Sequence, residues 1–187
     1  MPVISEEKAG GKNVLAFLDM LAWSEIGSAM LADPRSDDGY KLLVGSLPGR
    51  LKTFSSYDDH PRVMVTLNKL GIKSSAAGRY QFLSRTWDAI VRNYGFKGRF
   101  IPEAQDLAAI KLLKECGAYP LIQRGDVTGA IRKASPIWAS FPGAGYGQKE
   151  HALVALLEIY EEERHTDVQQ PEEELVAKYQ ACGGACC

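Results

Sequence analysis

The chain has 187 residues, of which 45% are hydrophobic and 24% are charged, and its formal net charge is −1. This composition is ordinary for a globular protein, so we expect one main domain with a short appendage. The near-neutral charge argues against a nucleic-acid-binding protein, because neutralising phosphates usually requires a basic face. No apolar run approaches the roughly 18 to 20 residues that span a bilayer, so we expect no membrane insertion.

The N-terminus reads Met-Pro-Val-Ile-Ser-Glu-Glu-Lys. It lacks the basic start followed by an apolar stretch that is typical of a secretory signal. We therefore expect the protein to stay in the cytoplasm of the cell that makes it until something else releases it.

The first half of the chain predicts one helix followed by a small hairpin. Residues 12–29 read as the helix, with two glycines before it and Gly27 near its end. Residues 40–57 look extended around a turn at Leu47-Pro48-Gly49-Arg50.

The second half is helical in pattern. We expect helices over 85–94 after the cap Ser84, from Pro102 to Cys116, over 127–134 after the cap Asp126, and over 148–163. Together with the hairpin this predicts an α+β fold dominated by helix, with a small β-hairpin or sheet inserted after the first helix and a helical lobe beyond it.

The composition changes near residue 165 and becomes polar and acidic. We therefore expect a main domain over 1–165 and a tail over 166–187. Three of the four cysteines, Cys182, Cys186 and Cys187, crowd the end of that tail. Since four-ligand zinc sites need one more ligand and no histidine is adjacent, we expect reactive thiols here and no metal site.

Glu25 stands out from the periodicity of the first helix. At about 100° per residue, Val14, Leu18, Leu21 and Glu25 fall on one stripe, whereas Asp19 lies toward the other side and reads as solvent-facing. The core-facing stripe thus ends in a carboxylate.

Burial and a position near the negative end of the helix dipole both raise the pKa of a carboxyl group. Glu25 is then suited to act as a general acid in cleavage of a glycosidic bond. The alternative is a glutamate whose side chain reaches water and has no catalytic role.

Two glycine-rich segments carry aromatic and amide side chains that suit sugar binding. Residues 76–82 place Gly78, Arg79, Tyr80 and Gln81 side by side, and residues 142–148 surround a tyrosine with three glycines. Glycine permits close backbone approach, tyrosine has an apolar face with a polar tip, and glutamine both donates and accepts. Ordinary loops next to helices are the alternative reading.

These segments resemble, in one order and with compatible spacing over roughly residues 14–160, the family of phage endolysins to which lambda lysozyme belongs. The matching runs are 17–25 (FLDMLAWSE), 39–40, 44–45, 59–62 (DHPR), 65–68 (VTLN), 77–81 (AGRYQ), 137–140 (IWAS) and 142–148 (PGAGYGQ).

The resemblance implies a lysozyme-like fold and lytic transglycosylase activity, which cuts between N-acetylmuramic acid and N-acetylglucosamine and leaves a 1,6-anhydro ring. It implies that Glu25 is the acid and base and that peptidoglycan glycan strands are the substrate. No metal or cofactor is implied. The residues that it places against the substrate are Ser24, Tyr40, Gly78, Arg79, Tyr80, Gln81, Gly145 and Tyr146.

Three alternatives stay open at this point. A true lysozyme on the same fold would add water, with a loop aspartate as its base. A peptidoglycan-binding or virion protein would have lost the activity. A wholly structural helical domain would leave the glycine-rich loops unexplained. If the chain is an endolysin with lytic transglycosylase activity, we expect a monomer that accumulates in the host cytoplasm and depends on a separate holin to reach the wall.

Overall fold

The computed structural model describes residues 1–68, 71–95, 99–145, 147 and 150–166. The elements run in the order α1 (Glu6–Ala9), α2 (Lys12–Ile26), α3 (Ser28–Leu31), the short 3-10 helix η1 (Pro34–Ser36), β1 (Val65–Leu67), β2 (Ile72–Ser74), α4 (Ser84–Tyr94), α5 (Pro102–Glu115), α6 (Tyr119–Gln123) and α7 (Val127–Ala134). A further helix follows over 153–166.

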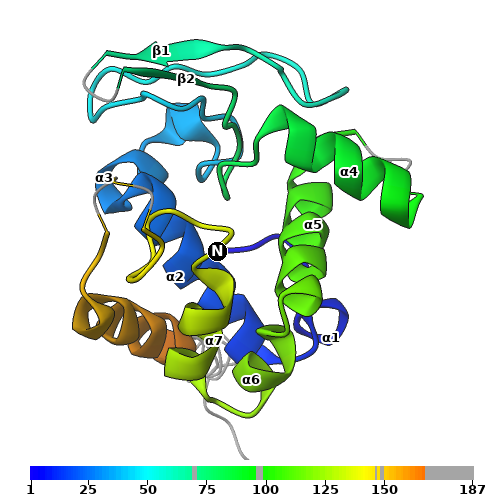
Figure 1. Ribbon diagram of the computed structural model, residues 1–187, viewed down its shortest axis with the longest axis vertical. Coiled ribbons are helices and arrows are strands. Elements are labelled where there is room, and N and C mark those ends of the chain that lie inside the picture. The colour runs from blue at the N-terminus through cyan, green and yellow to red at the C-terminus, as the bar shows by residue number, and fades with distance from the viewer. Residues whose placement is uncertain (69–70, 96–98, 146, 148–149, 167–187) are drawn as a thin grey trace, which may run out of the picture.

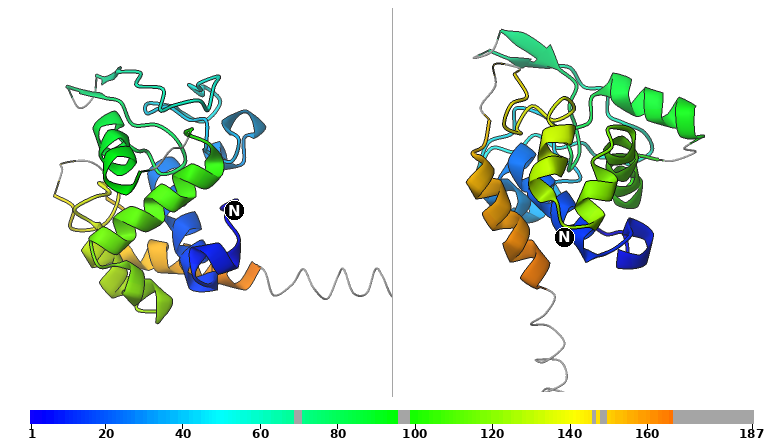
Figure 2. Two further views of the ribbon diagram at one scale, coloured as in Figure 1. Left: turned by 90° about the vertical axis from the view of Figure 1, so that its right-hand side faces the viewer. Right: turned by 60° about the horizontal axis from the view of Figure 1, so that its bottom comes forward.

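The molecule has a small β-containing lobe at one end and a larger helical lobe at the other (Figure 1). Helix α2 runs from the helical lobe toward the β lobe, and α5 stands opposite it with α4 across its upper end. The helix over 153–166 packs along the outside of the helical lobe (Figure 2), with Leu156 and Tyr160 buried in the common core. The fold is therefore the predicted α+β type dominated by helix.

Helix α2 is the central helix, and its predicted apolar stripe is confirmed. Val14, Leu18 and Leu21 are fully buried. The prediction that Asp19 faces solvent is wrong, because only 6% of this residue is exposed. The side of α2 that carries Asp19 is covered as well, by the Arg79 guanidinium.

The first helix ends earlier than predicted. Gly27 has a φ of 86°, and its N–H donates to the Trp23 carbonyl as the C-cap of α2. A new turn, α3, starts at Ser28. The expected helix over 12–29 is therefore two helices, and Glu25 lies in the last turn of the first one.

The β lobe differs in detail from the predicted hairpin. The turn forms as expected, since Leu47 and Arg50 exchange backbone hydrogen bonds of 3.3 and 2.8 Å. Beyond the turn, the two arms of the predicted hairpin pair through an isolated antiparallel bridge between Leu42 and Thr53. The two-stranded antiparallel sheet is formed later in the chain, where β1 pairs with β2 in the register Thr66↔Lys73.

The helices of the second half follow the sequence closely. The Asp126 side chain caps α7 by accepting from the Gly129 N–H at 2.9 Å, and Pro102 is the first residue of α5. Ser84, predicted as a cap, is instead the first residue of α4 and follows the cap Leu83. The last helix begins at residue 153, later than predicted.

The expected tail over 166–187 lies outside the described residues except for its first position. Within the described part of the chain, no helix combines the length and apolar character needed to cross a membrane.

Candidate active site

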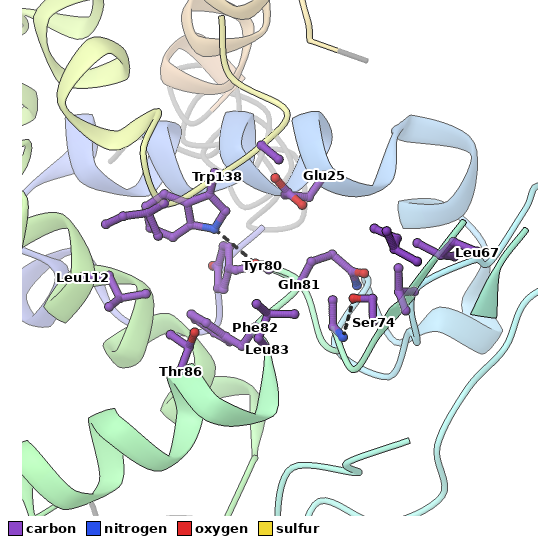
Figure 3. Close-up of a pocket in the computed structure, with 15 residues that line it drawn as sticks. Glu25, Leu67, Ser74, Tyr80, Gln81, Phe82, Leu83, Thr86, Leu112 and Trp138 are labelled. Atoms are coloured by element: carbon purple, nitrogen blue, oxygen red, sulfur yellow. Dashed lines mark hydrogen bonds between the residues drawn. The ribbon is translucent and has the colours of Figure 1, made fainter. Parts of the chain in front are cut away.

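A cleft of about 240 Å³ opens between the β lobe and the helical lobe. Figure 3 shows Glu25 on one side of it, with Gln81 and the strand residues Leu67 and Ser74 beyond it and Trp138 beside it. The described residues that line the cleft are Glu25, Val44, Leu67, Ile72, Ser74, Ala76, Tyr80, Gln81, Phe82, Leu83, Thr86, Leu112, Ile137, Trp138 and Ala139.

Glu25 is the one acidic residue among those described along the cleft. Burial raises the pKa of its carboxyl group to about 7, although hydrogen bonds from Ser140 oppose the shift. The Ser140 hydroxyl donates to Glu25 Oε1 at 2.6 Å. A carboxyl group with this pKa holds a proton near neutral pH and can also release it, as a general acid and base must.

Residues Gly78, Arg79, Tyr80 and Gln81 form a tight turn between Ala77 and Phe82, which exchange backbone hydrogen bonds of 3.0 and 2.9 Å. The turn brings Gln81 to the cleft wall, where its amide donates to the Gly78 carbonyl at 2.8 Å.

Gly78 is required by the packing behind this turn. Its φ is 80°, and an added Cβ would lie 2.2 Å from Gln105 Oε1. That Gln105 oxygen accepts the Arg79 N–H at 2.9 Å. The glycine therefore lets α5 approach the turn that forms the cleft wall.

Tyr80 lines the inner end of the cleft, but its side chain is fully buried and its hydroxyl points away from the opening. The Tyr80 and Tyr40 hydroxyls both donate to Asp106 Oδ1 at 2.7 Å. Asp106 Oδ2 accepts the backbone N–H groups of Val3 and Ile4 at 2.9 and 3.0 Å. Asp106 on α5 thus joins the N-terminal segment to the cleft wall.

Arg79 and Tyr40 do not face the cleft. Each is 1% exposed, and the Arg79 guanidinium pairs with Asp19 and Asp38. Both side chains support the cleft from behind, so the prediction that they touch substrate is not supported. A motif resemblance assigns residues to a region but does not say which way each side chain points.

Ser24 is likewise buried, at 6% exposure. Its hydroxyl lies 2.8 Å from the Leu21 carbonyl and 2.9 Å from the Ser140 hydroxyl. Ser24 is therefore behind Glu25 and not on the cleft surface. Gly145 is exposed, its N–H donates to Glu150 at 2.9 Å, and it is not among the described residues that line the cleft. Tyr146 lies outside the described residues.

Two side chains beside Glu25 were not predicted as site residues. Ser140 holds the Glu25 carboxyl group, and Trp138 lines the cleft while its indole N–H donates to the Tyr80 carbonyl at 3.2 Å. Trp138 is only 3% exposed, like a core residue. A tryptophan at a helical position in the sequence indicates packing and gives no sign that it also lines a cleft. Ser140 has no periodicity, and its contact with Glu25 spans 115 positions.

The loop aspartates, one of which the hydrolytic alternative requires as its base, have other partners. Asp33 pairs with Arg35, Asp59 pairs with Arg62, and Asp37 accepts a hydrogen bond from Tyr57. Asp38 pairs with Arg79, and Asp58 accepts from Ser56 at 2.7 Å. In the described residues, no cluster of three or more His, Cys, Asp or Glu side chains is placed to hold a metal ion.

Comparison with known proteins identifies the family. The family model described as Endolysin matches residues 15–168. The endolysin of Escherichia phage lambda is 49% identical over 147 residues, which cover 79% of this chain and 88% of that protein. The endolysin of Escherichia phage P2 is 41% identical over 164 residues, covering 86% and 95%. The chain belongs to the endolysin family.

Solved structures agree with this assignment. Bacteriophage lambda lysozyme in complex with a chitohexasaccharide superposes on this endolysin with a TM-score of 0.70 at 44% sequence identity, covering 87% of this chain and 97% of that one. A second structure, lysozyme from bacteriophage lambda, gives 0.69 at 45% identity, covering 82% and 94%. The predicted lysozyme-like fold is confirmed. Endolysins degrade bacterial peptidoglycan for lysis of the host.

Proposed function

We propose that this endolysin is a lytic transglycosylase that cuts the bond between N-acetylmuramic acid and N-acetylglucosamine through Glu25 and leaves a 1,6-anhydro end. The observation that carries the proposal is the single carboxyl group among the described cleft residues, with a pKa raised to about 7. A glycosidase that adds water usually needs two flanking carboxyl groups.

One carboxyl group suffices for the transglycosylase reaction. Protonated Glu25 gives its proton to the glycosidic oxygen, and the bond from that oxygen to C1 of N-acetylmuramic acid breaks. The substrate's own N-acetyl group stabilises the positive charge that develops at C1. The C6 hydroxyl of the same sugar then bonds to C1, and its proton passes to the Glu25 carboxylate. Glu25 ends the cycle protonated, as it began.

The tethered C6 hydroxyl has an advantage over water. It belongs to the same sugar ring, so its attack is intramolecular and benefits from a high effective concentration. The apolar side chains of the cleft, among them Leu67, Ile72 and Leu112, favour exclusion of competing water around the bound glycan.

The solved complex of lambda lysozyme with a chitohexasaccharide supports the placement of a glycan in this cleft, since the two chains share fold and 44% identity. We place the cut bond beside Glu25, with the glycan running past Gln81 and the ends of β1 and β2. Gln81 offers both a donor and an acceptor to sugar hydroxyl and acetamido groups.

The chemical nature of the new glycan ends distinguishes the transglycosylase reaction from hydrolysis. Purified Gram-negative peptidoglycan is digested in heavy-oxygen water, and the muropeptide ends are read by mass spectrometry. We expect anhydro ends, each lighter than a reducing end by one water and free of heavy oxygen. Reducing ends that carry heavy oxygen would instead establish a hydrolytic lysozyme on the same fold.

The role of Glu25 is tested in the same assay. Glu25→Gln keeps the size of the side chain but cannot exchange a proton, so we expect no new ends of either kind. The matched control is Glu158→Gln, an exposed glutamate on the helix over 153–166, which should digest the wall like the parent. Full activity of Glu25→Gln would show that Glu25 is not the catalytic acid and that the catalytic centre lies elsewhere in the protein.

We also propose that the protein acts as a monomer, that residues 1–165 form the catalytic domain with 166–187 as an appended tail, and that a separate holin releases it from the host cytoplasm to the wall. Fractionation of cells that express the protein alone checks the last point. We expect it in the cytoplasmic fraction without a holin and in the periplasm with one. Periplasmic protein in the absence of a holin would refute this route.

A further inference from the structure

A chain of oxygen atoms connects Glu25 with the backbone of its own helix. The Ser140 hydroxyl lies 2.6 Å from Glu25 Oε1 and 2.9 Å from the Ser24 hydroxyl, and the Ser24 hydroxyl lies 2.8 Å from the Leu21 carbonyl. The two serines are 8% and 6% exposed. With so little access to bulk water, the hydrogen bonds of this chain depend mainly on its own protons.

The proton count links the chain to the charge of Glu25. It has three oxygen-to-oxygen contacts, but each serine hydroxyl carries one proton, so the serines can fill two of them. The third proton comes from Glu25. When the Oε1 atom of Glu25 is protonated, it donates to Ser140, Ser140 donates to Ser24, and Ser24 donates to the Leu21 carbonyl.

The opposite direction suits the ionised form. Ser140 then donates to the Glu25 carboxylate and Ser24 donates to Ser140, because hydrogen bonds aimed at a negative charge are the stronger ones. The Leu21 carbonyl keeps the backbone hydrogen bond that any interior helical carbonyl accepts from four residues ahead. No heavy atom has to move for the chain to reverse.

We propose that Ser24 and Ser140 form a hydrogen-bond relay that reverses direction when Oε1 of Glu25 gains or loses its proton in the substrate-free enzyme, and so holds the carboxyl group in one position in both of its charge states. In the reaction the proton leaves from Oε2, the carboxyl oxygen that Ser140 does not contact, while Ser140 donates to Oε1. The relay deepens the proposed function, in which Glu25 acts first as acid and then as base. Ser24 and Ser140 are positioning residues, since they act on the substrate through Glu25.

His151 fixes the spacing of the relay from behind. Its backbone N–H donates to the Ser140 carbonyl at 2.9 Å, and its Nε2 lies 3.0 Å from the Ser24 carbonyl. Its ring also packs on Trp23 with a centroid separation of 4.7 Å. One residue therefore ties the backbone of both serines together, which keeps their hydroxyl groups within hydrogen-bonding distance.

The other titratable groups around the relay are few in the described residues. His151 packs against α2 from the loop that follows Ser140. Tyr80 faces Glu25 from the opposite wall, with its proton donated to Asp106. On α2 itself, Asp19 pairs with Arg79. Glu150, next to His151, accepts the backbone N–H groups of Gly143 and Gly145 at 2.8 and 2.9 Å. A change in the titration of Glu25 on removing a serine hydroxyl is therefore read against these four groups.

The test measures the pKa of Glu25 directly, by carbon NMR of carboxyl-labelled glutamate in the protein without substrate, with Glu25→Gln to assign the signal. In Ser24→Ala the protonated form of Glu25 loses two hydrogen bonds of the relay and the ionised form loses one. We expect the pKa of Glu25 to fall by about half a unit to one unit, which corresponds to one net hydrogen bond. An unchanged or raised pKa would overturn the relay.

A double variant shows whether Ser24 acts through Ser140. In a Ser140→Ala background, Ser24→Ala is expected to leave the Glu25 titration unchanged, because the connection is already broken. The same shift in both backgrounds would mean that Ser24 acts on Glu25 by another path, and the relay would be wrong.

Ser135→Ala is the matched control, since the Ser135 hydroxyl is equally buried and donates to a carbonyl three residues back, that of Arg132, at 3.1 Å. It should not shift the titration of Glu25. The titration of His151 is followed in every sample. If Ser24→Ala does not fold, Ser24→Cys retains a weak donor and acceptor and should lower the pKa by a smaller amount. Because no substrate is present, the result stands apart from whether the product is an anhydro end.

Discussion

Arg79 and Asp19 form a buried ion pair that joins the cleft wall to the helix that carries Glu25. Their side chains are 1% and 7% exposed, and Asp38 adds a second carboxylate to the same guanidinium at 2.6 Å. Asp19 and Glu25 share α2, whereas Arg79 lies in the turn that leads to Gln81. The pair therefore sets the separation of the two sides of the cleft.

Removing one partner of this pair should destabilise the protein. Asp19→Asn leaves the buried guanidinium with Asp38 as its remaining carboxylate, and burial raises the pKa of Asp19 to about 6, which opposes its charged form. We therefore expect a loss below the about 3 to 5 kcal/mol that follows when a buried charge keeps no partner. Urea unfolding followed by circular dichroism measures the change. Asp33→Asn, which breaks the exposed pair with Arg35, is the control and should change the free energy of unfolding far less, because solvent screens an exposed ion pair. Equal effects of the two variants would contradict the structural role of Arg79.

Gly78→Ala should lower the stability of the protein and distort the cleft. The new Cβ would meet the Gln105 amide at 2.2 Å and Phe100 at 2.9 Å, at a φ of 80° that alanine adopts poorly. We expect a loss above about 2 kcal/mol from the clash and the left-handed backbone together. Thermal unfolding checks it.

Gly49→Ala is the control for the backbone contribution alone. Gly49 has a φ of 77°, but an added Cβ would have no neighbour within 4 Å. Its loss should be limited to about 1 to 2 kcal/mol. A Gly78→Ala variant no less stable than Gly49→Ala would show that α5 can move away from the turn.

Glu25→Gln should stabilise the protein at alkaline pH but not in acid. The folded-state pKa of Glu25, about 7, lies above its ordinary value of 4.5. Stability from this group is thus fully present below about 4.5 and is lost as the pH rises through 7. The variant avoids that loss, which amounts to up to about 3 kcal/mol for a shift of this size. Melting temperatures of both proteins at pH 5 and pH 8 give the comparison. A difference that does not depend on pH would contradict the raised pKa.

Catalysis should weaken as Glu25 loses its proton. The first step needs the protonated acid, so the rate of release of muropeptides is expected to fall about tenfold per pH unit well above pH 7. The rate is measured at fixed ionic strength with soluble fragments, so that wall swelling does not contribute. A rate that stays level to pH 9 would exclude Glu25 as the acid.

The sequence predicts the local parts of this site better than its long-range contacts. Glu25 follows from the periodicity of Val14, Leu18 and Leu21, because a helix places residues on a stripe by geometry alone. The same rule fails for Asp19, since periodicity shows which residues share a face but not that a second face is covered too. Ser140 is beyond such reasoning, because its position beside Glu25 depends on how the whole chain folds.

The hairpin and the helix boundaries show a similar division. The turn at Leu47-Pro48-Gly49-Arg50 and the Asp126 cap are set by neighbours in sequence, and both form as predicted. The paired strands β1 and β2 were not predicted. Each is three residues long, which is too short for alternation to be distinguished from chance.

The hydrogen bonds of Asp106 impose an order on the folding of the chain. Its partners Val3 and Ile4 are 103 and 102 positions away, and Tyr40 is 66 away. Contacts of such high sequence separation form slowly, because closing a long loop is entropically unfavourable. A ribosome releases residues 1–4 long before α5 is synthesised, so the backbone N–H groups of Val3 and Ile4 have no Asp106 acceptor until then. The wall behind Tyr80 is therefore completed only after most of the chain has been synthesised, and a nascent fragment ending before α5 has no finished cleft.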